Sequence, residues 1–227
     1  MPNPRRNRHA AIFDVDGVLV DSEPLHREAW EHVFGRRGVV VADEDYTWSI
    51  GRRDVTFAGV VRDKFGLTDS AESLRDEKID FYLELLADRS ESFDGILELV
   101  QALSADWRIG ITSSAHLRAV DIVLSRFRLA PYFDAIVTNE TVANHKPHPE
   151  PYQVCARALE VDPADCVAFE DSVTGVASAR AAGMRVIALT TTFSADELCE
   201  ADAVIDSVAD TDEIVRLAED LLALPAR

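Results

Sequence analysis

The order of apolar and polar positions divides the chain into two kinds of segment. Between Glu23 and Leu86 the apolar residues recur at helical spacing, and no convincing strand interrupts them. After Gly95, short apolar runs alternate with helical patterns. Alternation of this kind is typical of parallel strands joined by crossover helices, whereas the first pattern predicts a purely helical unit.

The apolar periodicity gives approximate positions for these elements. Three helices of the first part are expected around Trp30, Val61 and Leu85. Strands are expected at 10–14, 108–112, 135–138, 166–169, 186–189 and 203–205, and later helices around Leu124, Cys155, Ala179 and Leu217. We therefore expect a doubly wound, Rossmann-like α/β core built from residues 9–20 and 93–227. We expect an all-helical cap domain, residues 21–92, to be inserted into this core.

Composition narrows the classes of protein to which the chain can belong. Its 227 residues, 47% of them apolar, are enough for a real core. A net charge of -18 argues against general affinity for nucleic acid or for an anionic membrane. No uncharged apolar run is long enough to span a bilayer, and residues 1–8 are interpreted as a disordered basic tail.

The cysteines Cys155, Cys166 and Cys199 are odd in number and lack the CxxC spacing of a zinc site. Neither a disulfide framework nor a zinc centre is therefore indicated, and a reducing cytoplasm fits best. Oligomeric state leaves no signal in the sequence, so a monomer is the default expectation.

An acidic pair, Asp14 and Asp16, stands where an apolar strand meets a glycine turn. Burying one carboxylate without compensation is costly, and burying two side by side would force one of them to take up a proton. Gly17 provides a position at which the backbone can turn sharply or approach a ligand. The arrangement suits a nucleophile and a proton donor beside a metal, although an acidic turn after a core strand has the same appearance.

Three further polar clusters follow predicted strands, where ligands bind in an open α/β sheet. They are Thr112-Ser113-Ser114, Asn144-His145-Lys146-Pro147 and Glu170-Asp171-Ser172. The first suits an oxyanion or a phosphate, and the carboxylates Asp14 and Asp171 suit a shared hard cation such as Mg²⁺. Each cluster also has a structural explanation, namely a helix cap, a solvated lysine or favourable charge at a helix N-terminus. Their shared position at strand ends favours a catalytic site.

The order of these clusters resembles the four motifs of the haloacid dehalogenase-like (HAD) superfamily, over essentially the whole chain. The motifs are Asp14-x-Asp16-Gly17, Thr112-Ser113-Ser114, Lys146-Pro147-x-Pro149 and Phe169-Glu170-Asp171-Ser172 with Gly175. The helical insert is similar to the cap of the subfamily that includes β-phosphoglucomutase and many sugar-phosphate phosphatases.

The resemblance implies a covalent mechanism. Asp14 would attack phosphorus and become an aspartyl phosphate, while Asp16 would protonate the leaving oxygen and then deprotonate the incoming nucleophile. A carboxylate attacks an anionic phosphate poorly unless charge is neutralised, and Mg²⁺ together with Lys146 would supply that neutralisation.

The resemblance also implies which residues bind the phosphoryl group and the metal. Ser113, the Ser114 amide and Lys146 would hold the transferring group. Asp14, Asp16 through its backbone carbonyl, and Asp171 would hold Mg²⁺, with Glu170 supporting the site directly or through water.

The aspartate at position 16 narrows the reaction, because the dehalogenase and phosphonatase branches lack it. We expect a Mg²⁺-dependent phosphatase of small phosphorylated metabolites, sugar phosphates in particular. A β-phosphoglucomutase-like phosphomutase is the alternative. A phospho-accepting receiver domain is a more remote alternative. Receivers are much shorter than this chain and lack a cap inserted after the first strand.

The mutase alternative depends on cap residues that would hold a second phosphate. His26 and Lys78 match the mutase pattern, whereas its arginine falls only approximately on Arg52 or Arg53. Both arginines follow Gly51 just before a predicted helix, and ordinary surface charge is their other interpretation.

Overall fold

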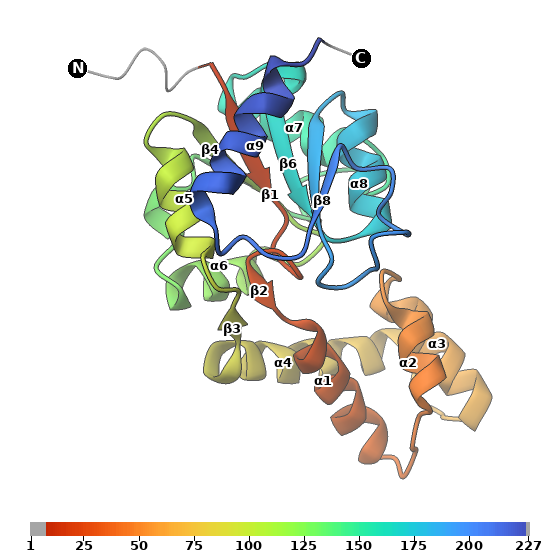
Figure 1. Ribbon diagram of the computed structural model, residues 1–227. Coiled ribbons are helices and arrows are strands. Elements are labelled where there is room, and N and C mark those ends of the chain that lie inside the picture. The colour runs from red at the N-terminus through yellow and green to blue at the C-terminus, as the bar shows by residue number, and fades with distance from the viewer. Residues whose placement is uncertain (1–7, 226–227) are drawn as a thin grey trace. The chain divides into compact units, whose positions relative to one another are not determined.

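The computed structural model describes residues 8–225, and a six-stranded sheet forms the centre of the α/β unit (Figure 1). The strand order is β5-β4-β1-β6-β7-β8, and every neighbouring pair is parallel. The strands are β1 (Ala10–Phe13), β4 (Arg108–Thr112), β5 (Ala135–Val137), β6 (Cys166–Glu170), β7 (Arg185–Leu189) and β8 (Ala203–Ile205). This order confirms the predicted doubly wound parallel fold.

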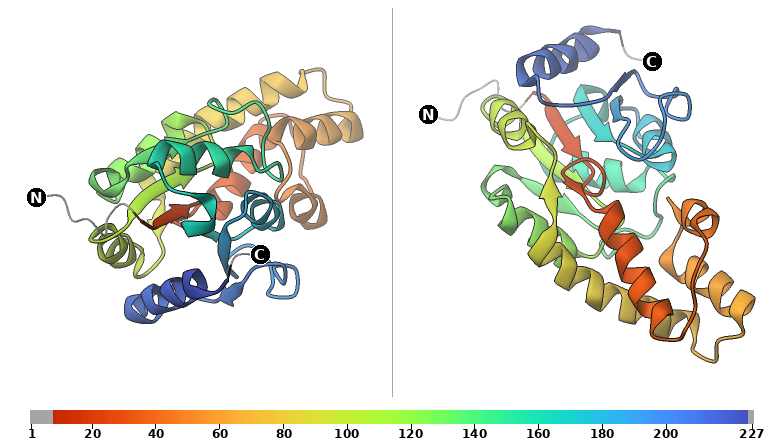
Figure 2. Two further views of the ribbon diagram at one scale, coloured as in Figure 1. Left: turned by 90° about the horizontal axis from the view of Figure 1, so that it is seen from above. Right: turned by 60° about the horizontal axis from the view of Figure 1, so that its bottom comes forward.

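Helices cover both faces of this sheet (Figure 2). They are α5 (Ile96–Ser104), α6 (Leu117–Arg126), α7 (Glu150–Leu159), α8 (Val173–Ala181) and α9 (Thr211–Ala223), with short 3-10 turns at Ala130–Tyr132 and Pro163–Asp165. Side chains of α7 and α8 pack against Ala10 and Ile12 of β1 and Ala168 of β6. Helices α5 and α9 contact each other on the opposite face. Burial on both faces explains why these strands are continuous apolar runs.

Strand β1 lies in the middle of the sheet and carries the first acidic residues of the candidate site. All four of its residues are fully buried between β4 and β6. The Phe13 ring stacks on Phe169 of β6 with 4.6 Å between ring centroids. Residues that leave the carboxyl end of β1 therefore start from a rigid support.

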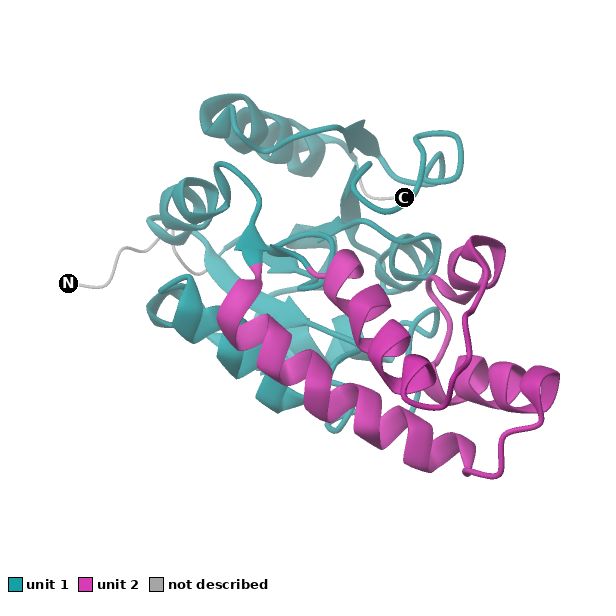
Figure 3. Ribbon diagram, turned by 90° about the horizontal axis from the view of Figure 1, so that it is seen from below, with its two compact units in different colours: residues 1–21, 91–227 teal, residues 22–90 magenta. Residues whose placement is uncertain are grey.

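The second compact unit, residues 22–90, is helical, and Figure 3 shows it in magenta. Its helices are α1 (Glu23–Gly35), α2 (Asp43–Ser49), α3 (Asp54–Phe65) and α4 (Ala71–Arg89). Trp30, Phe34 and Phe57 form the aromatic centre of its core. The first unit comprises residues 1–21 and 91–227. The sequence placed the cap at 21–92 and the core at 9–20 and 93–227.

The chain passes between the two units just after Asp21 and just before Glu91. The residues at these two places pair as a short antiparallel ladder, β2 (Val20–Asp21) and β3 (Glu91–Ser92). Two-residue strands carry no detectable alternation of apolar and polar positions, which is why the pattern did not reveal them. Of the predicted basic tail, residues 1–7 lie outside the described part of the chain. Among residues 8–225, none of the helices combines the length and apolar character that a membrane crossing requires.

Candidate active site

Asp14 and Asp16 lie at the carboxyl end of β1. The Asp14 N–H donates to the Phe169 carbonyl at 3.0 Å, so the ladder to β6 continues through this residue. A tight turn follows, in which the Gly17 N–H donates to the Val20 carbonyl at 2.9 Å. Gly17 has φ +75, and a Cβ there would lie 1.9 Å from Asp171 Oδ2. Glycine is therefore required both by the backbone conformation and by the approach of Asp171.

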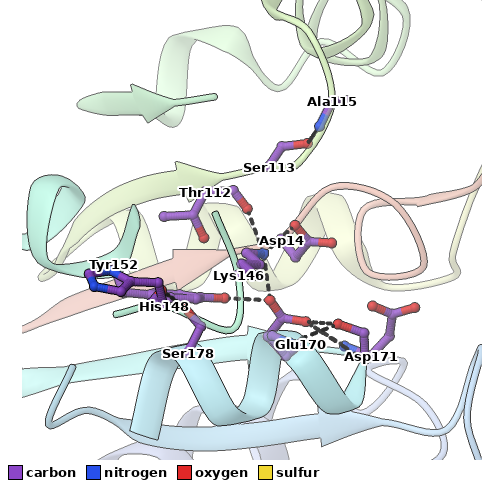
Figure 4. A network of polar contacts seen from close by, with 12 residues as sticks. Asp14, Thr112, Ser113, Ala115, Lys146, His148, Tyr152, Glu170, Asp171 and Ser178 are labelled. Carbon is purple, nitrogen blue, oxygen red and sulfur yellow. Dashed lines mark hydrogen bonds and ion pairs between the residues drawn. The ribbon is translucent and has the colours of Figure 1, made fainter. Parts of the chain in front are cut away.

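Lys146 brings a positive charge into this carboxylate cluster (Figure 4). Its Nζ lies 2.7 Å from Asp14 Oδ1, 2.5 Å from Glu170 Oε1 and 3.1 Å from the Thr112 carbonyl oxygen. Only 6% of the side chain is exposed. The three N–H groups of the ammonium thus have three acceptors, which come from the ends of β1, β4 and β6.

The loop that carries Lys146 is held by hydrogen bonds at both sides. The Glu150 carboxylate accepts from the backbone N–H groups of Ala143 and Asn144 at 2.9 and 3.0 Å. The Ser178 hydroxyl, on α8, donates to the His148 carbonyl at 2.6 Å. A charged side chain on a braced loop loses little conformational freedom when a ligand binds.

Glu170 is fully buried, and both of its carboxylate oxygens are used. Oε1 accepts from Lys146 and from the Tyr152 hydroxyl, at 2.5 and 2.6 Å. Oε2 accepts from the Asp171 N–H, the Ser172 N–H and the Ser172 hydroxyl, at 3.2, 3.4 and 3.1 Å. Five donors occupy a group that offers about four lone-pair directions. This arrangement favours a positioning role for Glu170 over direct ligation of a metal.

Threonines that follow β7 also reach the site, and the sequence interpretation missed them. The Thr191 hydroxyl donates to the Gly17 carbonyl at 2.5 Å. A hydrogen bond from Thr192 to the Asp171 carboxyl lowers the pKa of that group, against the larger effect of burial. The signal was present, because Thr190-Thr191-Thr192 stands at the carboxyl end of a predicted strand, as the other clusters do.

The electrostatics of the cluster are dominated by an excess of buried negative charge. Burial raises the pKa of Asp14 to about 7, and the charges of Glu170 and Asp16 add to this although Lys146 opposes it. Burial likewise raises the pKa of Asp171 well above its ordinary value, with further contributions from Asp14 and Glu170. One ammonium cannot neutralise so many carboxylates, so the site favours protons or an added cation.

The donor set agrees with a hard divalent cation. Among residues 8–225, ligand atoms of Asp14, Glu170 and Asp171 lie within 4.8 Å of one another, and all three residues are buried. Carboxylate oxygens are the ligands that Mg²⁺ prefers. Because the Glu170 oxygens already have donors, the carboxylates of Asp14 and Asp171 are the ones that would hold such an ion.

Thr112, Ser113 and Ser114 do not cap the helix that follows them. Helix α6 begins at Leu117, and the Leu117 N–H donates to the Glu140 carboxylate at 2.8 Å. The buried Ser113 hydroxyl instead accepts from the Ala115 N–H at 3.0 Å. The capping explanation is therefore wrong for these residues, and the Ser113 hydroxyl proton remains available for a ligand oxygen.

The comparison that decides the family covers most of the chain. The family model described as haloacid dehalogenase-like hydrolase matches residues 11–189, which include all four clusters. The chain belongs to this family. As a haloacid dehalogenase-like hydrolase it is an enzyme, of the branch that contains phosphatases and phosphomutases.

Two curated relatives and one solved structure illustrate the similarity. Fructose-1-phosphate phosphatase YqaB from Escherichia coli K12 is 30% identical over 183 residues, covering 78% of this chain and 93% of that protein. Hexitol phosphatase B from the same organism is 34% identical over 185 residues, covering 78% of this chain and 82% of that protein. A proposed β-phosphoglucomutase from Thermotoga maritima superposes with a TM-score of 0.79 at 26% identity, covering 92% and 99%.

The helical unit of this HAD-like hydrolase contains its own buried charge cluster. The Lys78 side chain is 1% exposed, and its Nζ lies 2.9 Å from Asp54 Oδ2 and 2.6 Å from His26 Nδ1. It also lies over the rings of Trp30 and Tyr82, 5.6 and 5.0 Å from their centroids. Burial opposes ionisation of Asp54, but Lys78 and His26 outweigh it and lower the pKa of that carboxyl. The structure thus brings the predicted residues His26 and Lys78 together.

Arg52 and Arg53 do not join that cluster. Both are exposed. The Arg52 Nε donates to the Trp48 carbonyl at 2.8 Å, and its guanidinium lies over the Trp48 ring at 4.5 Å from the centroid. Arg53 precedes α3 as its N-cap residue, without a side-chain cap.

Proposed function

We propose that the protein is a Mg²⁺-dependent phosphatase that hydrolyses small phosphorylated metabolites, sugar phosphates in particular, through an aspartyl-phosphate intermediate. One observation carries the proposal: the Lys146 ammonium lies 2.7 Å from Asp14 Oδ1 inside a cluster of buried carboxylates. A nucleophilic carboxylate next to a fixed cation is what attack on an anionic phosphate requires.

The reaction has two steps in this proposal. An Asp14 carboxylate oxygen forms a bond to phosphorus as the bond from phosphorus to the ester oxygen breaks, and Asp16 gives its proton to the leaving oxygen. A water molecule then attacks the phosphoryl group, Asp16 takes a proton from it, and the bond between phosphorus and the Asp14 oxygen breaks. Positioned proton transfer of this kind is typically worth about 10²–10⁴-fold in rate.

Three residues hold the transferring phosphoryl group: Ser113 and Ser114, which follow β4, and Lys146 on the loop before α7. Lys146 supplies positive charge beside the group, since its three N–H groups already have acceptors, and Ser113 supplies its hydroxyl. Among the described residues the Ser114 N–H donates to no protein acceptor, so it is free to bind a phosphoryl oxygen.

Asp14, Asp171 and the backbone carbonyl of Asp16 would hold Mg²⁺. When bound, the ion offsets the negative charge of the nucleophile and of the phosphate. Glu170 acts on the site through Lys146, because its own oxygens are occupied.

Mg²⁺ binding, pH and the stability of the fold are coupled through Asp14. The folded-state pKa of Asp14 is about 7, above the ordinary 3.8, so the folded metal-free protein holds that proton more tightly than the unfolded chain does. Raising the pH from the ordinary pKa toward the folded value therefore lowers the stability of the metal-free protein. We expect Mg²⁺ to raise Tm most at about pH 8. Its apparent affinity should fall about tenfold per pH unit below 7 for one competing proton.

Melting curves recorded with Mg²⁺ and with EDTA, at about pH 5.5 and about pH 8, test this expectation. Asp121→Asn, an exposed change on α6, should keep the magnesium-induced shift, whereas Asp171→Asn should lose it. An equal shift at both pH values would contradict the metal site.

Substrate preference is proposed from the relatives and from the helical unit. Two relatives are named fructose-1-phosphate phosphatase and hexitol phosphatase. Their names support a phosphorylated sugar or polyol as the substrate of this enzyme. We propose that His26 and Lys78 of the helical unit, with Arg52 or Arg53, act in substrate binding.

The decisive assay measures phosphate release from a panel of sugar phosphates, with Mg²⁺ and with EDTA. We expect release from several esters in Mg²⁺ and none in EDTA. The absence of release from every ester at saturating Mg²⁺ would overturn the proposed phosphatase.

A phosphomutase is the second candidate, supported by the structural similarity to the proposed β-phosphoglucomutase and by the matching pair His26 and Lys78. Following β-glucose 1-phosphate by NMR separates the two. Glucose 6-phosphate with little free phosphate would identify a mutase, and free phosphate with glucose would identify the phosphatase.

A further inference from the structure

Tyr152 is a fully buried side chain that the proposed reaction does not use. It lies in the first turn of α7, directly after the loop that carries Lys146. Its hydroxyl donates to Glu170 Oε1 at 2.6 Å, and the Lys146 Nζ lies 5.2 Å from the centre of its ring. Figure 4 shows the tyrosine reaching the cluster from the side opposite Asp14. A buried tyrosine needs some acceptor, but this acceptor is the oxygen that also binds the catalytic lysine.

We propose that Tyr152 is a positioning residue, which fixes the Lys146 ammonium at the nucleophile by acting through Glu170. The effect on kcat that follows from this inference rests on the proposed phosphatase function. Glu170 Oε1 has two donors, and the phenol holds it from the side away from Asp14.

Loss of the phenol hydroxyl would change the balance of contacts around the ammonium. Lys146 divides its three N–H groups among Asp14, the Thr112 carbonyl and Glu170. Without Tyr152, Oε1 keeps Lys146 as its single donor, so the Glu170 carboxylate would draw the ammonium toward itself and away from Asp14. The phosphoryl group would then lose part of its counter-charge during transfer, when the charge is most needed.

Tyr152→Phe isolates this effect because it keeps the ring and its packing and removes one oxygen. We expect kcat to fall about tenfold, as for the loss of a hydrogen bond to a charged group, while KM changes little. Tyr132→Phe is the matched control. It removes a hydroxyl that accepts from Gln101 Nε2 at 2.8 Å outside the site, and it should leave kcat unchanged.

A double-mutant cycle shows whether the tyrosine acts through Glu170. In a Glu170→Gln background, Tyr152→Phe should cause no further fall in kcat. A Tyr152→Phe enzyme with wild-type kcat would overturn the proposal, and so would a second full tenfold loss in the Glu170→Gln background.

A second readout does not require turnover. In nitrogen-15-labelled protein, the lysine ammonium protons held by three acceptors should give a protected NMR signal, assigned by its loss in Lys146→Met. We expect that signal to shift or broaden in Tyr152→Phe and to be unchanged in Tyr132→Phe. An unprotected Lys146 signal in the wild-type protein would refute the positioning role without any variant. An inactive wild-type protein with the expected shift would instead reject the phosphatase and keep the role of Tyr152.

Discussion

Asp14→Asn is expected to lower phosphate release by about 10⁴-fold or more while the protein stays folded. The amide keeps the shape of the carboxylate, and its oxygen can still accept from the Lys146 Nζ, which lies 2.7 Å from Asp14 Oδ1. It cannot form the phosphoryl ester, because an amide oxygen is a far weaker nucleophile than a carboxylate. Activity is measured as phosphate release in Mg²⁺.

The stability of the same variant provides a second expectation. Burial and neighbouring charge raise the pKa of Asp14 to about 7, so its ionised form is unfavourable in the folded metal-free protein at higher pH. Removing that charge should leave the free energy of unfolding in EDTA unchanged or higher. Urea unfolding measures this.

A control variant separates the role of Asp14 from a general effect of losing an acid. Asp121→Asn changes an exposed aspartate of α6 in the same unit and should keep full activity. If Asp14→Asn retained a tenth of the wild-type rate, the covalent mechanism would be wrong.

The strands of the fold were predictable because their signal is local. A strand such as β1 is covered on both faces and is therefore a continuous apolar run. The clusters at Asp14, Thr112 and Glu170 were predictable for the same reason, since each stands at the end of such a run, whereas Lys146 follows β5 only after a loop. The parallel topology then places these ends at one edge of the sheet, as Lys146, Asp14 and Glu170 show.

Short elements escaped prediction because they contain too few residues to show a period. Helix α2, Asp43–Ser49, has a single buried residue, Tyr46, and acidic residues throughout its first turn. Helix α5, Ile96–Ser104, was missed for a different reason: its apolar face gives a detectable period, but the prediction did not use it.

The roles proposed for Tyr152 and Glu170 could not be derived from the sequence because they depend on contacts between distant residues. The resemblance assigned Glu170 to the metal site, directly or through water. Its carboxylate is already occupied by donors from α7, from the Lys146 loop and from the start of α8. Among the apolar residues of α7, Tyr152 had the appearance of an ordinary core residue.

Gly175→Ala is expected to lower kcat about 100-fold and to destabilise the fold, although it places the best helix former inside a helix. A Cβ at this position of α8 would lie 2.0 Å from the carboxyl carbon and both carboxylate oxygens of Glu170. No real contact is so short, so Glu170 or the helix must move. Phosphate release and urea unfolding measure the two effects.

Gly59→Ala is the matched control, because it also replaces a glycine inside a helix. A Cβ there would have only the Ala71 Cβ near it, at 3.8 Å. The free energy of unfolding should therefore rise by about 1 kcal/mol, from the higher helix propensity of alanine alone, and activity should be unchanged.

Whether Gly175→Ala raises or lowers the free energy of unfolding depends on how much energy it costs to move the Glu170 side chain. A long side chain at the surface would turn away at little cost. Glu170 cannot, because moving its carboxylate breaks hydrogen bonds to Tyr152, Lys146 and Ser172 and leaves buried polar groups unpaired. We therefore expect a net loss of about 1–3 kcal/mol. A variant as stable as Gly59→Ala and as active as the wild type would show that the Glu170 network does not hold Lys146 in place.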